Sequence, residues 1–360
     1  MREYIFVIVT VAILLIIALT VFLKKMRQKT IKKLVYSRTF SERGVFEGDT
    51  VIMTETIYNP SFLPIFRLDM EYYVFEELKI EGYEASRKGS MQYCISRFNL
   101  LPFMQIQRTH VIRCKKRGYY KLDTSSVYTN KDNVYFDAPC ELYVYPRQLD
   151  MNVPPSPMNL LQGDVTTTMR LVIDPFSFDG VRDYRVGDPF NSINFKQTAK
   201  AGKLMVNNRE YSSSRLFKIF LNFDAETKFD LSTKEYESMM EQSLSFAAFL
   251  IDEAIRFGYK VGLSANCVLT DGRMKLETEL GGGDDHFEFL LREMAMMRPR
   301  TGVSFASILK KGIEDSLTMT EIYVFTVEVT EAMENYIYDM RRSGNSVNVV
   351  LLRPKEDSDE

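Results

Sequence analysis

The chain has 360 residues, and this length accommodates a membrane segment and two domains, each with its own core. Its 46 Lys and Arg against 48 Asp and Glu give a formal net charge of -2. That balance argues against nucleic acid as the main partner, because nucleic-acid-binding domains favour a basic surface. The four cysteines include no C-x-x-C pair, so we expect no zinc site and predict free buried thiols in a reducing compartment.

The first predicted element is a transmembrane helix over residues 4–23, where the run from Tyr4 to Leu23 carries no charge. About 20 helical residues span a hydrocarbon core of about 30 Å. A cleaved signal peptide is the alternative, but the run is long for one and lacks a small-x-small cleavage site. Basic residues follow the run and only Arg2 precedes it, so the positive-inside rule predicts a single-pass protein of the plasma (inner) membrane with cytoplasmic soluble domains. These basic residues are Lys24, Lys25, Arg27, Lys29, Lys32 and Lys33.

A β-rich domain is predicted over residues 38–146, where the hydrophobic pattern has a period of two. In one run, Leu68, Met70, Tyr72 and Val74 alternate with polar or aromatic residues on the other face. Turn signals such as Asn59-Pro60 separate several runs of this kind. Short strands with regular turns indicate an antiparallel, immunoglobulin-like β-sandwich.

Residues 147–214 are predicted to form a connector, which is rich in proline at its start. From residue 215 to 354 the pattern changes to alternating strands and helices, which predicts a mainly parallel, doubly wound α/β sheet. Ser232 and Glu235 form a capping box before a long amphipathic helix that stops at Gly258. The fold class is therefore α+β multi-domain. The predicted strands are Leu216–Phe223, Val261–Ala265, Met274–Leu280, Ile322–Val327 and Val347–Leu352, and the further helices are Phe287–Met297, Ser304–Ile313 and Glu331–Arg342.

Candidate metal ligands follow the first of these strands. Asn222, Asp224 and Glu226 place side-chain oxygens at every second position, which suits a hard cation such as Mg²⁺. The alternative is a solvated strand end that leads into a helix cap. The chain has two histidines and no G-x-S-x-G motif, so no nucleophilic catalytic set is indicated.

The segment Gly180–Glu210 is dense in charge and resembles the signature of the domain of unknown function 58 family. The resemblance includes Gly180, Gly187-Asp188, Ile193 and Gly202-Lys203-Leu204. Phe195 stands where the family usually has Trp. We interpret the charged members as internal pairs that hold the junction between the two domains. The candidate motif or interaction residues are Arg182, Asp183, Tyr184, Arg185, Gly187, Asp188, Asn194, Phe195 and Lys196.

The resemblance implies that the α/β domain is similar to a von Willebrand factor A domain. The metal-ion-dependent adhesion site of such domains would fall on Asn222, Asp224 and Glu226, with Thr301 from a later loop. Val327 stands near the position of a further ligand and cannot bind a cation, so the implied site is degenerate. Members of the family are typically membrane-anchored and act beside MoxR-type AAA+ ATPases and other von Willebrand A proteins.

The leading hypothesis is therefore a membrane-anchored, non-enzymatic interaction or scaffold protein that works with a MoxR-type AAA+ ATPase and uses no cofactor. A second hypothesis is a metal-dependent hydrolase that uses Asp224 and Glu226 with a divalent cation. A third is an extracytoplasmic adhesion module.

Overall fold

The computed structural model describes residues 2–82, 86–89, 91–129, 132–149, 180–184, 193–208, 216–224 and 233–352. The chain divides into two compact units. The first, here the β unit, comprises Met1–Gln148 with Leu291–Met296. The second, here the α/β unit, comprises Leu149–Leu290 with Met297–Glu360.

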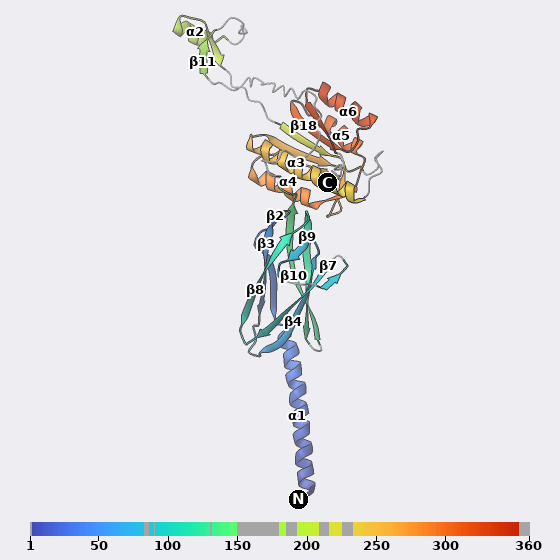
Figure 1. The fold of residues 1–360 in the computed structure, drawn as a ribbon. Coiled ribbons are helices and arrows are strands. Elements are labelled where there is room, and N and C mark those ends of the chain that lie inside the picture. Colours follow the sequence, from blue (N-terminus) through green and yellow to red (C-terminus); the bar gives the residue numbers. More distant parts are fainter. Residues whose placement is uncertain are drawn as a thin grey trace. The chain divides into compact units, whose positions relative to one another are not determined.

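The β unit begins with one long helix, α1 (Arg2–Ile31), which contains the whole predicted span (Figure 1). By length and composition, α1 is apolar enough to cross a membrane over Val9–Ile31. It continues past the apolar run to a final turn in which Thr30 and Ile31 are buried. Ile31 and Leu34 belong to the hydrophobic cluster of the strands that follow, so the end of the helix packs into the core of the β unit.

Two sheets follow the helix. The buried side chains of both sheets form one cluster, which is the core of the unit. Every pairing among the described strands is antiparallel except that of β2 with β10. The four-stranded sheet has the order β1 (Val35–Phe40), β3 (Thr50–Tyr58), β8 (Gln105–Cys114), β5 (Leu78–Ile80), and the six-stranded sheet has the order β2 (Gly44–Phe46), β10 (Asp132–Tyr145), β9 (Gly118–Thr129), β4 (Ile65–Phe75), β7 (Met91–Leu100), β6 (Ser86–Lys88).

The core of the β unit follows the period-two pattern of its strands. The predicted inward face of β4 is confirmed, because Leu68, Met70, Tyr72 and Val74 are all buried. All four cysteines of the chain are free and buried, as predicted. Burial raises the pKa of the Cys94 thiol to about 12, with the charge of a neighbouring glutamate adding to the shift.

One carboxylate lies inside this core. Glu55 on β3 is fully buried and accepts hydrogen bonds from Tyr36 Oη at 2.6 Å and Ser96 Oγ at 3.0 Å. His110 Nε2 lies 2.8 Å from Oε2, the oxygen that also accepts from Ser96, whereas Tyr36 donates to Oε1. Burial raises the pKa of the Glu55 carboxyl, but the contacts with His110, Tyr36 and Ser96 outweigh burial and leave that pKa below its ordinary value. Side chains from three other strands therefore supply the polar contacts of the buried carboxylate.

The α/β unit contains a five-stranded sheet that is parallel apart from one edge, as predicted. Its order is β16 (Leu276–Glu277), β14 (Lys260–Ala265), β13 (Leu216–Leu221), β18 (Thr320–Thr326), β19 (Ser346–Leu351). The helices are α3 (Thr233–Arg256), α5 (Phe305–Glu314), α6 (Glu331–Arg342) and the first part of α4 (Asp284–Met296), whose residues Leu291–Met296 are counted with the β unit. In addition, β15 (Cys267–Leu269) pairs with β17 (Met297–Thr301). Ser232 of the predicted capping box lies outside the described residues.

Two details of the strand prediction are wrong. The strand expected over Met274–Leu280 shrinks to the two residues of β16. The regular ladder is interrupted at Thr278, whose hydroxyl takes the Leu263 N–H at 2.7 Å and whose carbonyl accepts from Lys218 Nζ at 2.9 Å. Beyond it, pairing resumes only as a single bridge between Gly281 and Val261. The second error concerns β17, because Pro299 was expected only to end a helix and instead lies within this strand. A proline is compatible with β17 because β17 is an edge strand of a two-stranded sheet.

Candidate functional site

Three parallel strands of the α/β unit end side by side, and a polar residue stands at each end. Asn222 follows β13, Asn266 follows β14, and Thr326 is the last residue of β18. All three side chains belong to buried residues. Because the carboxyl ends of parallel strands share one edge, this edge is where doubly wound sheets bind ligands.

Asn266 is the centre of this edge and is fully buried. Its side-chain nitrogen Nδ2 lies 2.7 Å from Asp224 Oδ1, 3.1 Å from the Val303 carbonyl oxygen and 3.3 Å from Asn222 Oδ1. Its Oδ1 accepts the Phe223 N–H at 2.6 Å, which fixes the orientation of the amide. One amide group therefore ties together the loops that follow β13 and β17.

Two hydroxyl groups complete the network. Asn222 Nδ2 donates to Thr326 Oγ1 at 3.0 Å, and Thr326 Oγ1 donates to the Glu328 carbonyl at 2.6 Å. Thr301 Oγ1 donates to the Phe223 carbonyl at 2.5 Å. Asn222 Oδ1 also accepts the Asp224 N–H at 2.9 Å, which closes a local turn at the end of β13. We call Asn222, Asp224, Asn266, Thr301 and Thr326 the strand-end network.

The chemistry of the network is that of hydrogen bonding rather than of charge. Three oxygens converge on Asn266 Nδ2, in an arrangement that a cation would otherwise complete. The two amide hydrogens supply the positive ends of dipoles at that point, and the most distant of the three oxygens, Asn222 Oδ1, also accepts the Asp224 N–H. In the part of the chain that the structure describes, no group of three His, Cys, Asp or Glu side chains gathers as a metal site would require.

Among the predicted metal ligands, Asn222, Asp224 and Thr301 are brought together at this edge, as expected for their strand-end positions. Glu226 lies outside the described residues. Asn266 was not singled out from the sequence. The signal for it was a lone amide after a fully buried strand, Val261–Ala265, in register with the strand before Asn222.

A buried tyrosine lies close to the network. Tyr236 on α3 is buried, and its Oη has no hydrogen-bond partner among the residues that the structure describes. Burial raises the pKa of the Tyr236 phenol, and the charges of Asp224 and Cys267 raise it further. The phenol is therefore a neutral hydrogen-bond donor beside Asp224.

The signature segment forms a strand pair and a short helix. β11 (Gly180–Asp183) pairs with β12 (Met205–Asn208), and α2 (Phe195–Ala201) lies between them in sequence. Asn194 is the N-cap of α2 and accepts the Gln197 N–H at 3.0 Å. Arg182 takes part in the β11–β12 ladder through its backbone, opposite Val206.

The predicted internal ion pairs of this segment stay a prediction, and one ion pair is seen among its described residues. Asp183 binds Lys203 at 2.7 Å, and both side chains are exposed. The Tyr184 N–H donates to the Leu204 carbonyl. Phe195 and Lys196 are exposed on the first turn of α2, while Arg185, Gly187 and Asp188 lie outside the described residues.

Residues 180–355 match the family model described as "Protein of unknown function DUF58". Over 177 residues, the chain is 24% identical to "Uncharacterized protein YeaD" of Bacillus subtilis (strain 168), a match that covers 49% of this chain and 40% of that protein. The chain thus spans less than half the length of this relative.

Solved structures offer only remote likenesses. A β-glucosidase from Listeria innocua is 12% identical with a TM-score of 0.18, over 31% of this chain and 17% of the glucosidase. Spo0M, a sporulation control protein from Bacillus subtilis, is 11% identical with a TM-score of 0.21, over 31% of this chain and 49% of that protein. With TM-scores this low, neither likeness bears on fold or function.

Proposed function

We propose that this chain, which belongs to the DUF58 family through residues 180–355, is a membrane-anchored, non-enzymatic interaction protein. In this proposal α1 is a single-pass anchor, the β unit is an immunoglobulin-like sandwich, and the α/β unit is a von Willebrand A-like domain. The α/β unit presents the edge that carries the strand-end network to a protein partner.

The observation that carries the proposal is the position of Asn266. Its side-chain nitrogen lies within hydrogen-bonding distance of three oxygens at the edge where this kind of sheet binds ligands. A buried, mutually satisfied polar network holds loops rigid, and rigid loops suit recognition.

The partner we propose is a MoxR-type AAA+ ATPase, with other von Willebrand A proteins in the same assembly. This part of the proposal rests on the family. The contact surface would include the loop after β17, where Val303 is half-buried and Ser304 is exposed. Ser304 is the N-cap of α5, yet its side chain makes no capping hydrogen bond. A substitution there changes the rim of the network with little effect on folding.

The test is affinity purification of the full-length chain from membranes in the presence of a slowly hydrolysed ATP analogue. We compare the wild type with Ser304→Arg and with Ser346→Arg. Ser346 is also exposed but begins β19, so it lies at the opposite edge of the sheet. We expect the wild type and Ser346→Arg to recover an AAA+ ATPase and Ser304→Arg to lose it. Equal recovery by all three, or recovery by none, contradicts the proposal.

The cytoplasmic placement of the soluble units has its own test. The native cysteines are all buried and give little background, so Ser346→Cys supplies one accessible thiol. In intact cells, a membrane-impermeant maleimide should leave this thiol unlabelled and should label it after lysis. Labelling in intact cells would instead support the extracytoplasmic hypothesis.

A further inference from the structure

Two loops of the β unit that are hydrogen-bonded to each other, one of which leads to a contact with the end of α1, expose large apolar side chains. The β3–β4 loop and the start of β4 present Phe62 and Phe66, which are 66% and 55% exposed. The β7–β8 loop presents Leu101 and Phe103, which are 52% and 63% exposed. We call these four residues the apolar rim. Large apolar groups that gather on one surface mark an interaction site more often than isolated ones do.

The apolar rim is held in place by a buried asparagine. Asn59 is fully buried, and its Nδ2 donates to the Leu63 carbonyl at 2.8 Å and to the Leu101 carbonyl at 3.1 Å. Its backbone N–H donates to the Met104 carbonyl, and the Phe103 N–H donates to the Ser61 carbonyl. The two loops are therefore locked together, although 42 positions separate Asn59 from Leu101.

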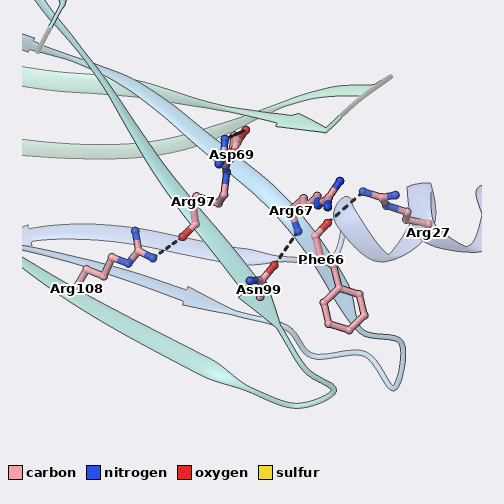
Figure 2. A network of polar contacts seen from close by, with 7 residues as sticks. All are labelled: Arg27, Phe66, Arg67, Asp69, Arg97, Asn99 and Arg108. Atoms are coloured by element: carbon pink, nitrogen blue, oxygen red, sulfur yellow. Dashed lines mark hydrogen bonds and ion pairs between the residues drawn. The ribbon is translucent and has the colours of Figure 1, made fainter.

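The backbone also directs these side chains outward. A register shift between Ile65 and Leu68 marks a bulge in β4, and the two residues between them are both exposed. Within this bulge, Arg67 has a φ of 54°, and Phe103 in the other loop has a φ of 55°. Non-glycine residues adopt this left-handed region only where the surrounding structure imposes it. The Arg67 N–H is fixed by Asn99 Oδ1 at 2.9 Å (Figure 2).

A direct contact places the rim against the helix. Arg27 Nη2 donates to the Phe66 carbonyl at 3.4 Å, as Figure 2 shows. Arg27 is four residues beyond Leu23, the last residue of the uncharged run, or about 6 Å along the helix axis. The headgroup layer of a bilayer is about 5 to 7 Å thick on each side of the hydrocarbon core. If α1 spans the membrane, Phe66 lies at the level of the headgroups.

Charge around the rim matches such a surface. Arg67 is exposed beside Phe66, the end of α1 exposes Lys25, Arg27 and Lys29, and Lys32 is exposed just after the helix. Aromatic residues with neighbouring basic residues are the combination that binds the interface of an anionic bilayer. Each basic residue near such a surface contributes attraction that salt weakens.

We propose that the apolar rim inserts into the headgroup region of the same bilayer that holds α1, with Arg27 and Arg67 contacting anionic lipids. The β unit then docks on the membrane at two places, the helix and the rim. This inference rests on the proposed membrane anchor.

The chain has no tryptophan, so a single substitution supplies a unique fluorescent reporter. We use the full-length chain in vesicles of phosphatidylcholine with phosphatidylglycerol, with lipids brominated near the top of the acyl chains as quenchers. The reporters are Phe62→Trp, Phe66→Trp and Phe103→Trp. The matched control is Tyr73→Trp, which is 40% exposed and stands on β4 about 23 Å beyond Phe66.

We expect blue-shifted emission and strong quenching at the three rim positions, and water-like, unquenched emission at position 73. Quenching at the rim no stronger than at position 73 overturns the inference. Blue-shifted emission without quenching also overturns it, because a protein rather than lipid would then cover the rim. In vesicles of phosphatidylcholine alone we expect weaker quenching, and equal quenching would overturn the role of anionic lipid.

Flotation of the same vesicles separates this inference from the anchor on which it rests. Protein that floats and resists alkaline extraction is anchored, whatever the reporters show. If the protein floats but its reporters are unquenched, the proposed insertion of the apolar rim is overturned and the membrane anchor is not. Protein that does not float overturns the anchor.

Discussion

Replacing Asn266 by alanine removes the amide on which the strand-end network depends. In the wild type this amide makes contacts with Asn222, Asp224, Val303 and the Phe223 N–H. The contacts differ in how easily water can replace them. Asp224 and Val303 are half-buried and can recover partners from solvent, whereas Phe223 is fully buried.

The cost of this change follows from that difference. The Phe223 N–H left without an acceptor costs about 1 to 3 kcal/mol, and the lost hydrogen bonds of the half-buried groups add about 1 kcal/mol. We therefore expect Asn266→Ala to lower the local free energy of unfolding by about 2 to 4 kcal/mol. Each 1.4 kcal/mol or so corresponds to a tenfold larger equilibrium constant for local opening.

Hydrogen exchange measured by mass spectrometry on the full-length chain is the appropriate assay, because a protein with two units need not unfold in one step. Peptides that cover Leu216–Leu221 and Phe223 should lose protection, while peptides of the β unit keep theirs. Asn348→Ala is the control: Asn348 is half-buried on β19, and its amide makes no hydrogen bond among the described residues. If both variants exchange alike in the β13 peptides, our account of Asn266 is refuted.

Four further changes test other parts of the structure. Asn266→Asp adds a carboxylate beside Asp224, so Mg²⁺ should raise its melting temperature more than that of the wild type; an equal response would show that the oxygens do not converge on a cation-sized space. Burial lowers the pKa of the Lys218 ammonium from 10.5 to about 8. Between pH 8 and pH 10.5 the unfolded chain therefore binds more protons than the folded chain, and the free energy of unfolding should rise by about 3 kcal/mol across this range. Lys218→Met should therefore be more stable than the wild type at pH 7, with a gap that closes toward pH 10 in denaturant titrations. The pKa of Glu55 is lowered in the folded protein, so the stability that its charge contributes is present above pH 4.5 and is lost as the pH falls through the folded pKa. In denaturant titrations, Glu55→Gln should therefore be less stable than the wild type at pH 7, and the difference should shrink in acid. Gly302→Ala would place a Cβ 1.9 Å from the Met274 carbonyl oxygen, and we expect circular dichroism melting to show a large loss of stability; an unchanged melt would contradict this loop geometry.

Elements with a strong hydrophobic period could be predicted from the sequence. Helix Glu331–Arg342 has the predicted bounds, because a threonine cap before it and a glycine after it define its ends locally. Predicted strand Ile322–Val327 is shifted by one or two residues from β18. The extent of the strand predicted over Met274–Leu280 could not be predicted from its own residues, because the Thr278 carbonyl accepts a hydrogen bond from Lys218, which is distant in sequence.

The strand-end network shows the same limit. Asn222, Asp224 and Thr301 stand at positions where an α/β sheet is expected to bind ligands, and their proximity could be predicted. The role of Asn266 could not, because it depends on the convergence of two loops, those after β13 and β17, on one nitrogen atom. Glu55 is a parallel case. It sits on the inward face of β3 between Met53 and Ile57, and its partners come from β1, β7 and β8.

The buried end of α1 has a mechanical consequence. Because Ile31 and Leu34 pack in the core of the β unit, and the helix continues from the apolar run to that core without a break, the β unit has no swivel at its base. If α1 is the membrane anchor that we propose, a tilt of the helix within the bilayer becomes a tilt of the whole β unit, with a lever arm as long as its strands. Bilayer thickness, which sets helix tilt, would then set the angle at which the β unit stands on the membrane.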